Sequence, residues 1–125
     1  MHEDWRAVVV AHSQFRTYKL TVGTVGLDLA SARSETYAHP GALPAVAPGS
    51  IDDDLARRDF SINAMAVSLD ERSWGDLLDP HRAREDIESG VIRILHPGSF
   101  VDDATRLLRA ARYAGRMGFR LDSRT

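Results

Sequence analysis

The chain has 125 residues with no cysteine, a net charge of −2 and 43% hydrophobic residues, which fits one small globular domain rather than a disordered or fibrous protein. Without cysteine, disulfides, thiolate catalysis and thiolate zinc sites are excluded. No apolar run approaches the roughly 18 residues of a membrane span, and the first four residues do not begin a secretory signal, so we expect a cytoplasmic protein with no membrane partner.

The first half of the chain predicts neighbouring strands followed by a loop and a short helix. Three β-rich stretches cover residues 6–11, 16–22 and 24–32, with Gly23 and Gly26 marking turns or bulges. Residues 37–49 are rich in proline, which removes amide donors, and predict a loop. Ser50-Ile51-Asp52-Asp53 resembles a capping box, and Arg57-Arg58 suits the far end of the helix that it begins.

The second half predicts short elements and then one clear helix. We expect a helix from residue 60 that turns into strand by 69, strands at 75–78 and 91–95, and a helix at 82–89. Over residues 102–117 the apolar side chains share one helical face and an arginine stripe lies beside it. The apolar residues are Leu107, Leu108, Ala111 and Ala114, and the stripe is Arg109, Arg112 and Arg116.

The charges are unevenly distributed along the chain. Residues 1–92 hold nine basic and fifteen acidic residues, a net of −6, whereas residues 93–125 hold seven and three, a net of +4. The C-terminal third therefore carries the cationic surface. All but one of the basic residues are arginine, which suits phosphate and base edges, although a genomic bias toward arginine explains the same composition.

Several segments, taken in order, are similar to the head of class II tRNA nucleotidyltransferases (CCA-adding enzymes) and bacterial poly(A) polymerases, of the DNA polymerase β-like nucleotidyltransferase superfamily. These segments are Leu27-Asp28-Leu29 with Arg33-Ser34-Glu35-Thr36-Tyr37, Pro40-Gly41-Ala42-Leu43-Pro44, Asp54-Leu55-Ala56-Arg57-Arg58-Asp59-Phe60-Ser61-Ile62-Asn63-Ala64-Met65-Ala66, and Ser99-Phe100-Val101-Asp102-Asp103-Ala104-Thr105-Arg106 followed by Arg109 and Arg112. The resemblance implies an α+β fold: a truncated polymerase β-like head, with a mixed β-sheet, flanking helices and a C-terminal neck helix. It divides the chain into a partial head over 1–98 and the start of the neck over 99–125.

The resemblance implies that Asp28 is a catalytic residue and a ligand of Mg²⁺, because it matches the third acid of the family's catalytic strands. Hard Mg²⁺ prefers oxygen ligands, which clustered carboxylates supply. The family's first segment, a Gly-Gly-x-x-Arg-Asp loop followed by Asp-x-Asp, has no counterpart here. Asp52 and Asp54 have the letters of that pair but lie in a capping position. We therefore expect this chain alone to have little or no activity.

The resemblance also implies a nucleotide-binding set. The residues that match those holding the sugar and phosphates are Arg57, Arg58, Asp59, Asn63, Arg109 and Arg112. Asp59 and Asn63 are four residues apart and would share one face of a helix. The alternative is purely structural, with arginines near a helix end and an aspartate that caps the next helix.

Asp103 and Arg106 match the pair that serves the family as a protein template for the incoming base. Three residues apart on a helix, they would project side by side. A carboxylate accepts from an exocyclic amine and a guanidinium donates to a ring nitrogen, so the pair suits cytosine and adenine but not uracil or guanine. Alternatively, Asp102 and Asp103 only complement a helix N-terminus.

The leading hypothesis is a fragment of a template-independent RNA nucleotidyltransferase, whose complete form transfers CMP or AMP from CTP or ATP to the 3′ end of tRNA or another RNA. Two alternatives stay open: a non-catalytic nucleotide- or RNA-binding remnant, and one half of a split enzyme whose partner chain supplies the missing carboxylates. The chain also departs from the family at Arg16, where members have glycine, and at Arg82-Ala83, near which they have Gly-Gly.

Overall fold

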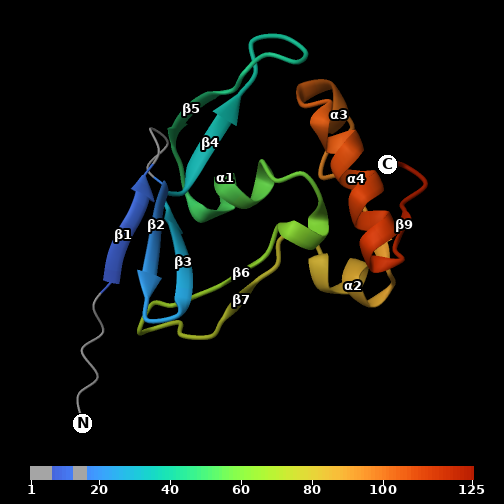
Figure 1. The fold of residues 1–125 in the computed structure, drawn as a ribbon. Coiled ribbons are helices and arrows are strands. Elements are labelled where there is room, and N and C mark those ends of the chain that lie inside the picture. The colour runs from blue at the N-terminus through green and yellow to red at the C-terminus, as the bar shows by residue number, and fades with distance from the viewer. Residues whose placement is uncertain (1–6, 13–16) are drawn as a thin grey trace. The chain divides into compact units, whose positions relative to one another are not determined.

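The computed structural model describes residues 7–12 and 17–125, which form short strands and helices in an α+β arrangement (Figure 1). The predicted α+β class is confirmed. The chain divides into two compact units, Met1–Ala32 and Arg33–Thr125, and the predicted domain boundary at residue 98 stays a prediction. Among the described residues, no helix is long and apolar enough to cross a membrane.

The first unit contains an antiparallel meander in the order β1-β2-β3, formed by β1 (Ala7–His12), β2 (Thr17–Val22) and β3 (Val25–Ala30). The three predicted strands are therefore confirmed, with slightly different bounds. Gly23, in the turn between β2 and β3, has a φ of 59°, a conformation without steric cost for glycine. This register pairs Lys19 with Asp28. Phe15 and Arg16 lie outside the described residues.

The second unit begins with an antiparallel hairpin of β4 (Arg33–Thr36) and β5 (Ala45–Pro48). The prediction of a loop throughout residues 37–49 is therefore wrong for β5. Pro48 is tolerated because it ends a strand in a two-stranded sheet, where each strand is an edge. The capping box is confirmed at α1 (Ile51–Ala56): the Ser50 hydroxyl accepts from the Asp53 amide at 3.2 Å, and the Asp53 carboxylate accepts from the Ser50 amide at 2.8 Å.

The middle of this unit contains shorter elements than the sequence predicted. The helix expected from residue 60 is one 3-10 turn, η1 (Ser61–Asn63), which precedes the antiparallel pair β6 (Ala66–Val67) and β7 (Leu77–Leu78). Next come α2 (Ala83–Glu88) and β8 (Val91–Ile92). Arg82 has a φ of 58° before α2, a left-handed conformation that favours glycine.

The C-terminal part holds α3 (Ser99–Asp102), α4 (Thr105–Met117) and β9 (Arg120–Leu121) (Figure 1). Strand β9 runs parallel to β8. The single helix predicted over 102–117 is broken, because Asp103 has an extended backbone. All four residues of the predicted apolar face lie in α4, where Ala114 packs against the core but Leu108 is 76% exposed. The residues that α4 buries are Arg106 and Ala110. The core of this unit packs Ala110 with Phe60, Ile62 and Ile92.

Candidate functional site

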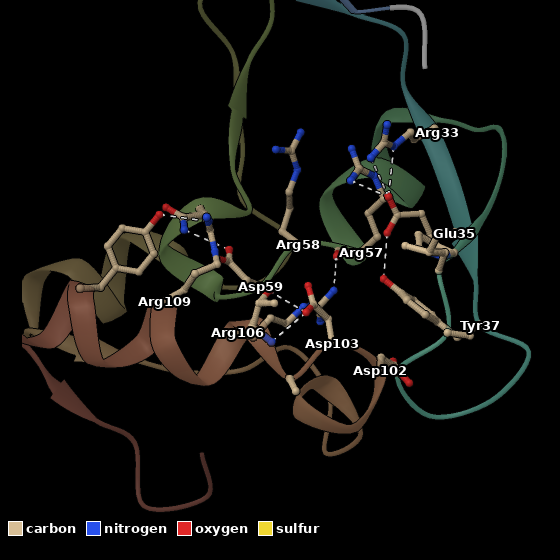
Figure 2. Close-up of a pocket in the computed structure, with 18 residues that line it drawn as sticks. Arg33, Glu35, Tyr37, Arg57, Arg58, Asp59, Asp102, Asp103, Arg106 and Arg109 are labelled. Carbon is tan, nitrogen blue, oxygen red and sulfur yellow. Dashed lines mark hydrogen bonds and ion pairs between the residues drawn. The ribbon is translucent and has the colours of Figure 1, made fainter. Parts of the chain in front are cut away.

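A cavity of about 930 Å³ lies in the second unit. Its lining comes from β4 and the loop after it, from the segment that follows α1, and from the start of α4. Figure 2 shows Glu35 and Tyr37 on one side of this cavity, Asp59 and Arg109 on the other, and Asp103 between them. Seven of the eight predicted nucleotide-binding residues line it, namely Arg57, Arg58, Asp59, Asn63, Asp103, Arg106 and Arg109.

Asp54, in α1, is a buried anion that orders the arginines at the end of that helix. It is 5% exposed. Its Oδ1 accepts from Arg57 Nη2 at 2.6 Å, and its Oδ2 forms an ion pair with Arg58. Burial favours the neutral acid, but the hydrogen bonds from both arginines outweigh burial and hold the pKa of Asp54 below its ordinary value. The structure therefore gives Asp54 a role in the fold.

Glu35, in β4, is a second buried anion at the cavity. One of its oxygens accepts from Arg33 Nη2 at 2.8 Å and from Arg57 Nη1 at 3.0 Å, and the other accepts from the Tyr37 hydroxyl at 3.0 Å. Burial and the adjacent Glu35 carboxylate raise the pKa of Tyr37, so this hydroxyl remains a donor. The sequence patterns assigned no role to Arg33, Glu35 or Tyr37. Their spacing of two residues is a signal that could have grouped them, because alternate positions of a strand share one face.

Asp59 holds two cavity residues in place. Its Oδ1 accepts from the Phe60 amide at 2.9 Å and from Asn63 Nδ2 at 3.0 Å, and its Oδ2 accepts from Arg109 Nε at 2.6 Å. Asp59 raises the pKa of Arg109, whose guanidinium carbon lies 5.5 Å from the Tyr113 ring centroid. Asp59 and Asn63 therefore contact each other, but not from one face of a helix as predicted, because Phe60 between them has an extended backbone and only Ser61–Asn63 form a 3-10 turn. Arg109 is held at the cavity wall.

Asp103 and Arg106 both line the cavity, but they do not project from one helix as predicted. Asp103 precedes α4, and its Oδ1 accepts from the amide and the hydroxyl of Thr105 at 2.9 and 2.6 Å. The Thr105 hydroxyl, with the amide, lowers the pKa of Asp103. Arg106 is 5% exposed and donates to the Ser99 hydroxyl at 2.6 Å and to the Arg57 carbonyl at 3.0 Å.

Residues 1–93 match the family model of the poly(A) polymerase head domain. The chain belongs to this family. It is 56% identical over 99 residues to the A-adding tRNA nucleotidyltransferase of Halalkalibacterium halodurans, a match that covers 79% of this chain and 23% of the relative. The structure of an apo CCA-adding enzyme matches with a TM-score of 0.88 and 40% identity, over 95% of this chain and 28% of that one.

A second solved structure is a tRNA nucleotidyltransferase complexed with a primer tRNA and an incoming ATP analogue. It matches with a TM-score of 0.80 and 41% identity, over 95% of this chain and 32% of that one. The chain thus spans about a quarter to a third of the length of these relatives. Their likeness confirms the α+β head fold.

The described part of this poly(A) polymerase head domain does not complete a metal site. Asp28, in β3, belongs to the first unit, its side chain is 65% exposed, and its Oδ2 lies 3.9 Å from Lys19 Nζ. Within residues 7–12 and 17–125 no group of three or more His, Asp or Glu side chains is placed to hold an ion. Arg112, exposed on α4, is not part of the cavity lining. The roles predicted for Asp28 and Arg112 stay predictions.

Proposed function

We propose that this head domain is the nucleotide-selecting part of a template-independent tRNA nucleotidyltransferase. The complete enzyme transfers CMP or AMP from CTP or ATP to an RNA 3′-hydroxyl and releases pyrophosphate. One observation carries the proposal: Asp103 and Arg106 line the same cavity as Arg58 and Arg109. The relatives named A-adding and CCA-adding, and the complex with primer tRNA and an ATP analogue, support the same activity.

The cavity offers separate groups for the phosphates and for the base. The side chains of Arg58 and Arg109 are 43% and 40% exposed, so their guanidinium groups are accessible to a triphosphate. Arg57 is less accessible, because its guanidinium is engaged by Glu35 and Asp54. Asp103 supplies an acceptor and Arg106 supplies donors, the combination that pairs with the amine and ring nitrogen of cytosine or adenine.

The proposal extends to Mg²⁺, with Asp28 as one ligand and further oxygen ligands from outside the described residues. In this family of reactions the ion would stabilise the negative charge that develops on the phosphates. A single exposed carboxylate beside Lys19 does not hold Mg²⁺ by itself. The residues of the cavity therefore account only for binding of the nucleotide and selection of its base.

Binding of the four nucleoside triphosphates tests the selection. By isothermal titration calorimetry, the chain is expected to bind CTP and ATP at least about 10-fold more tightly than UTP and GTP. Asp103→Ala removes the acceptor and should abolish most of this preference. Asp122→Ala is a matched control, because Asp122 also accepts from the amide two residues later, at 2.9 Å, but lies outside the cavity lining. Equal binding of all four nucleotides, or an unchanged preference in Asp103→Ala, would show that the template role is wrong.

A second candidate, the non-catalytic nucleotide- or RNA-binding remnant, is favoured by the lack of a metal-binding cluster in the described parts of the chain. Incorporation of labelled ATP and CTP into tRNA separates the candidates. The chain alone should incorporate neither nucleotide, and incorporation by it would contradict our expectation. Activity that appears only with a second chain containing Gly-Gly and Asp-x-Asp segments would identify a split enzyme.

A further inference from the structure

Arg106 is oriented by two acceptors of the chain. Ser99, in α3, is fully buried, and its hydroxyl accepts from Arg106 Nη1 at 2.6 Å, while Nη2 donates to the Arg57 carbonyl at 3.0 Å. Because these bonds begin from two different terminal nitrogens, they fix the plane of the guanidinium. A guanidinium carries five N–H donors. Among the described residues only the two acceptors named above engage this guanidinium. Arg106 is 5% exposed but lines the cavity, so the surface that it presents there carries donors whose direction these two bonds set.

Asp103 is oriented by Thr105. The Thr105 hydroxyl and amide donate to the same carboxylate oxygen, Oδ1, at 2.6 and 2.9 Å. The other oxygen, Oδ2, receives no hydrogen bond from any residue that the structure describes. Thr105 therefore determines which oxygen of Asp103 is occupied and which one is available as an acceptor at the cavity.

The geometry points to Ser99 and Thr105 as positioning residues for base selection, whose hydroxyl groups fix the donors of Arg106 and the acceptor of Asp103. The inference rests on the proposed function and deepens it. Discrimination between bases requires a donor and an acceptor to be aligned at once. Loss of either hydroxyl therefore lowers discrimination, whereas the attraction of the triphosphate to Arg58 and Arg109 is kept.

Four variants of the full chain test this inference. Ser99→Ala and Thr105→Val remove the two hydroxyls. Thr105→Ser keeps its hydroxyl. Ser61→Ala is the matched control for Ser99→Ala, because Ser61 is also fully buried and its hydroxyl also bonds a charged side chain, that of Asp86, away from the cavity lining.

Dissociation constants for CTP, UTP and inorganic tripolyphosphate give the decisive readout. In Ser99→Ala and in Thr105→Val the preference for CTP over UTP should fall by about 5- to 10-fold. The affinity for tripolyphosphate should stay within about 2-fold, since charge–charge attraction to the arginines is unaffected. Thr105→Ser and Ser61→Ala should keep the wild-type preference.

The outcomes separate the inference from the proposed function. If the wild-type chain shows no preference between CTP and UTP, the proposed function fails and the inference fails with it. If Asp103→Ala abolishes the preference but Ser99→Ala and Thr105→Val retain it, the inference alone is overturned. Should Ser99→Ala not fold, the comparison of Thr105→Val with Thr105→Ser decides, because Thr105 is exposed and its substitution leaves no cavity in the core.

Discussion

Asp59 and Asp103 line the same cavity, yet only Asp59 has both carboxylate oxygens hydrogen-bonded within the described chain. Asp59 belongs to the fully paired wall, residues 54–63, in which Asp54, outside the cavity lining, is also paired through both oxygens. Asp103 belongs to the other wall, residues 103–109, and retains one oxygen without a partner among the residues described. Asp54 and Asp59 are buried, and a buried carboxylate oxygen without a partner is costly, so their hydrogen bonds serve the fold. Asp103 is less buried and keeps one oxygen as an acceptor for a ligand in the cavity.

The largest effect is expected at the fully paired wall. Asp54→Ala leaves Arg58 without its carboxylate partner and Arg57 with Glu35 alone, and it should lower the free energy of unfolding by about 2–3 kcal/mol. Asp103→Ala, the matched change at the other wall, removes the acceptor of the Thr105 amide at the start of α4 and should cost only about 1 kcal/mol. Urea denaturation followed by circular dichroism measures both. Similar losses of unfolding free energy in the two variants would contradict the assignment of Asp54 to the fold and of Asp103 to ligand binding.

Arg109 connects the two walls, because it projects from α4 and binds Asp59. Arg109→Ala should weaken the binding of all four nucleoside triphosphates by about 10-fold, the loss of one charge-assisted contact to phosphate. Arg112→Ala changes the next arginine of the same stripe, which is not among the residues that line the cavity, and should weaken binding less. Titration calorimetry compares the variants. Equal losses would show that Arg112 also reaches the nucleotide, as the family resemblance implies.

Local sequence patterns predicted the parts of the fold that depend on neighbours in the chain. The capping box at Ser50 and the three strands of the first unit are of this kind. The break at Asp103 was missed because its own carboxylate accepts from the Thr105 amide, an alternative to a continuous helix. The burial of Arg106 was missed because one of its acceptors, the Arg57 carbonyl, is 49 residues away.

Contacts between residues that are far apart in the sequence were also missed at the candidate site. Motif resemblance identified the residues that carry charge at the cavity, but it did not identify what each charge contacts. Glu35 joins β4 to α1 through Arg57, over 22 residues of sequence, and no local pattern contains that contact. Ser99 belonged to a matching segment but had no predicted role; the structure shows that its hydroxyl accepts from Arg106.

The lowered pKa of Asp54 predicts a pH dependence of stability for the fully paired wall. An aspartate in the unfolded chain has a pKa of about 3.9. Because the folded-state value is lower, the ion pairs with Arg57 and Arg58 contribute their full stability above about pH 4, and this contribution is lost as the pH falls through the folded-state pKa. Asp54→Asn should lose less stability over the same acid range. Parallel unfolding curves for both proteins between about pH 5 and pH 2 would contradict the assignment.

The smallest expected effect concerns the support of Arg109. The Tyr113 hydroxyl accepts from Arg109 Nη2 at 3.1 Å, and the ring packs edge-on against Phe60. Tyr113→Phe keeps the ring and removes one neutral acceptor, so it should cost about 0.5–1 kcal/mol of unfolding free energy.

Triphosphate affinity in Tyr113→Phe should stay within about 2-fold of wild type, since Asp59 still holds Arg109 Nε at 2.6 Å through a stronger, charge-assisted bond. Tyr113→Leu is the companion variant that also removes the aromatic ring beneath the Arg109 guanidinium. Its loss of triphosphate affinity should exceed that of Tyr113→Phe. A loss in Tyr113→Phe as large as that of Arg109→Ala would mean that the hydroxyl contacts the nucleotide directly. In that case Tyr113, which also lines the cavity, would be a ligand contact one turn beyond Arg109 on α4.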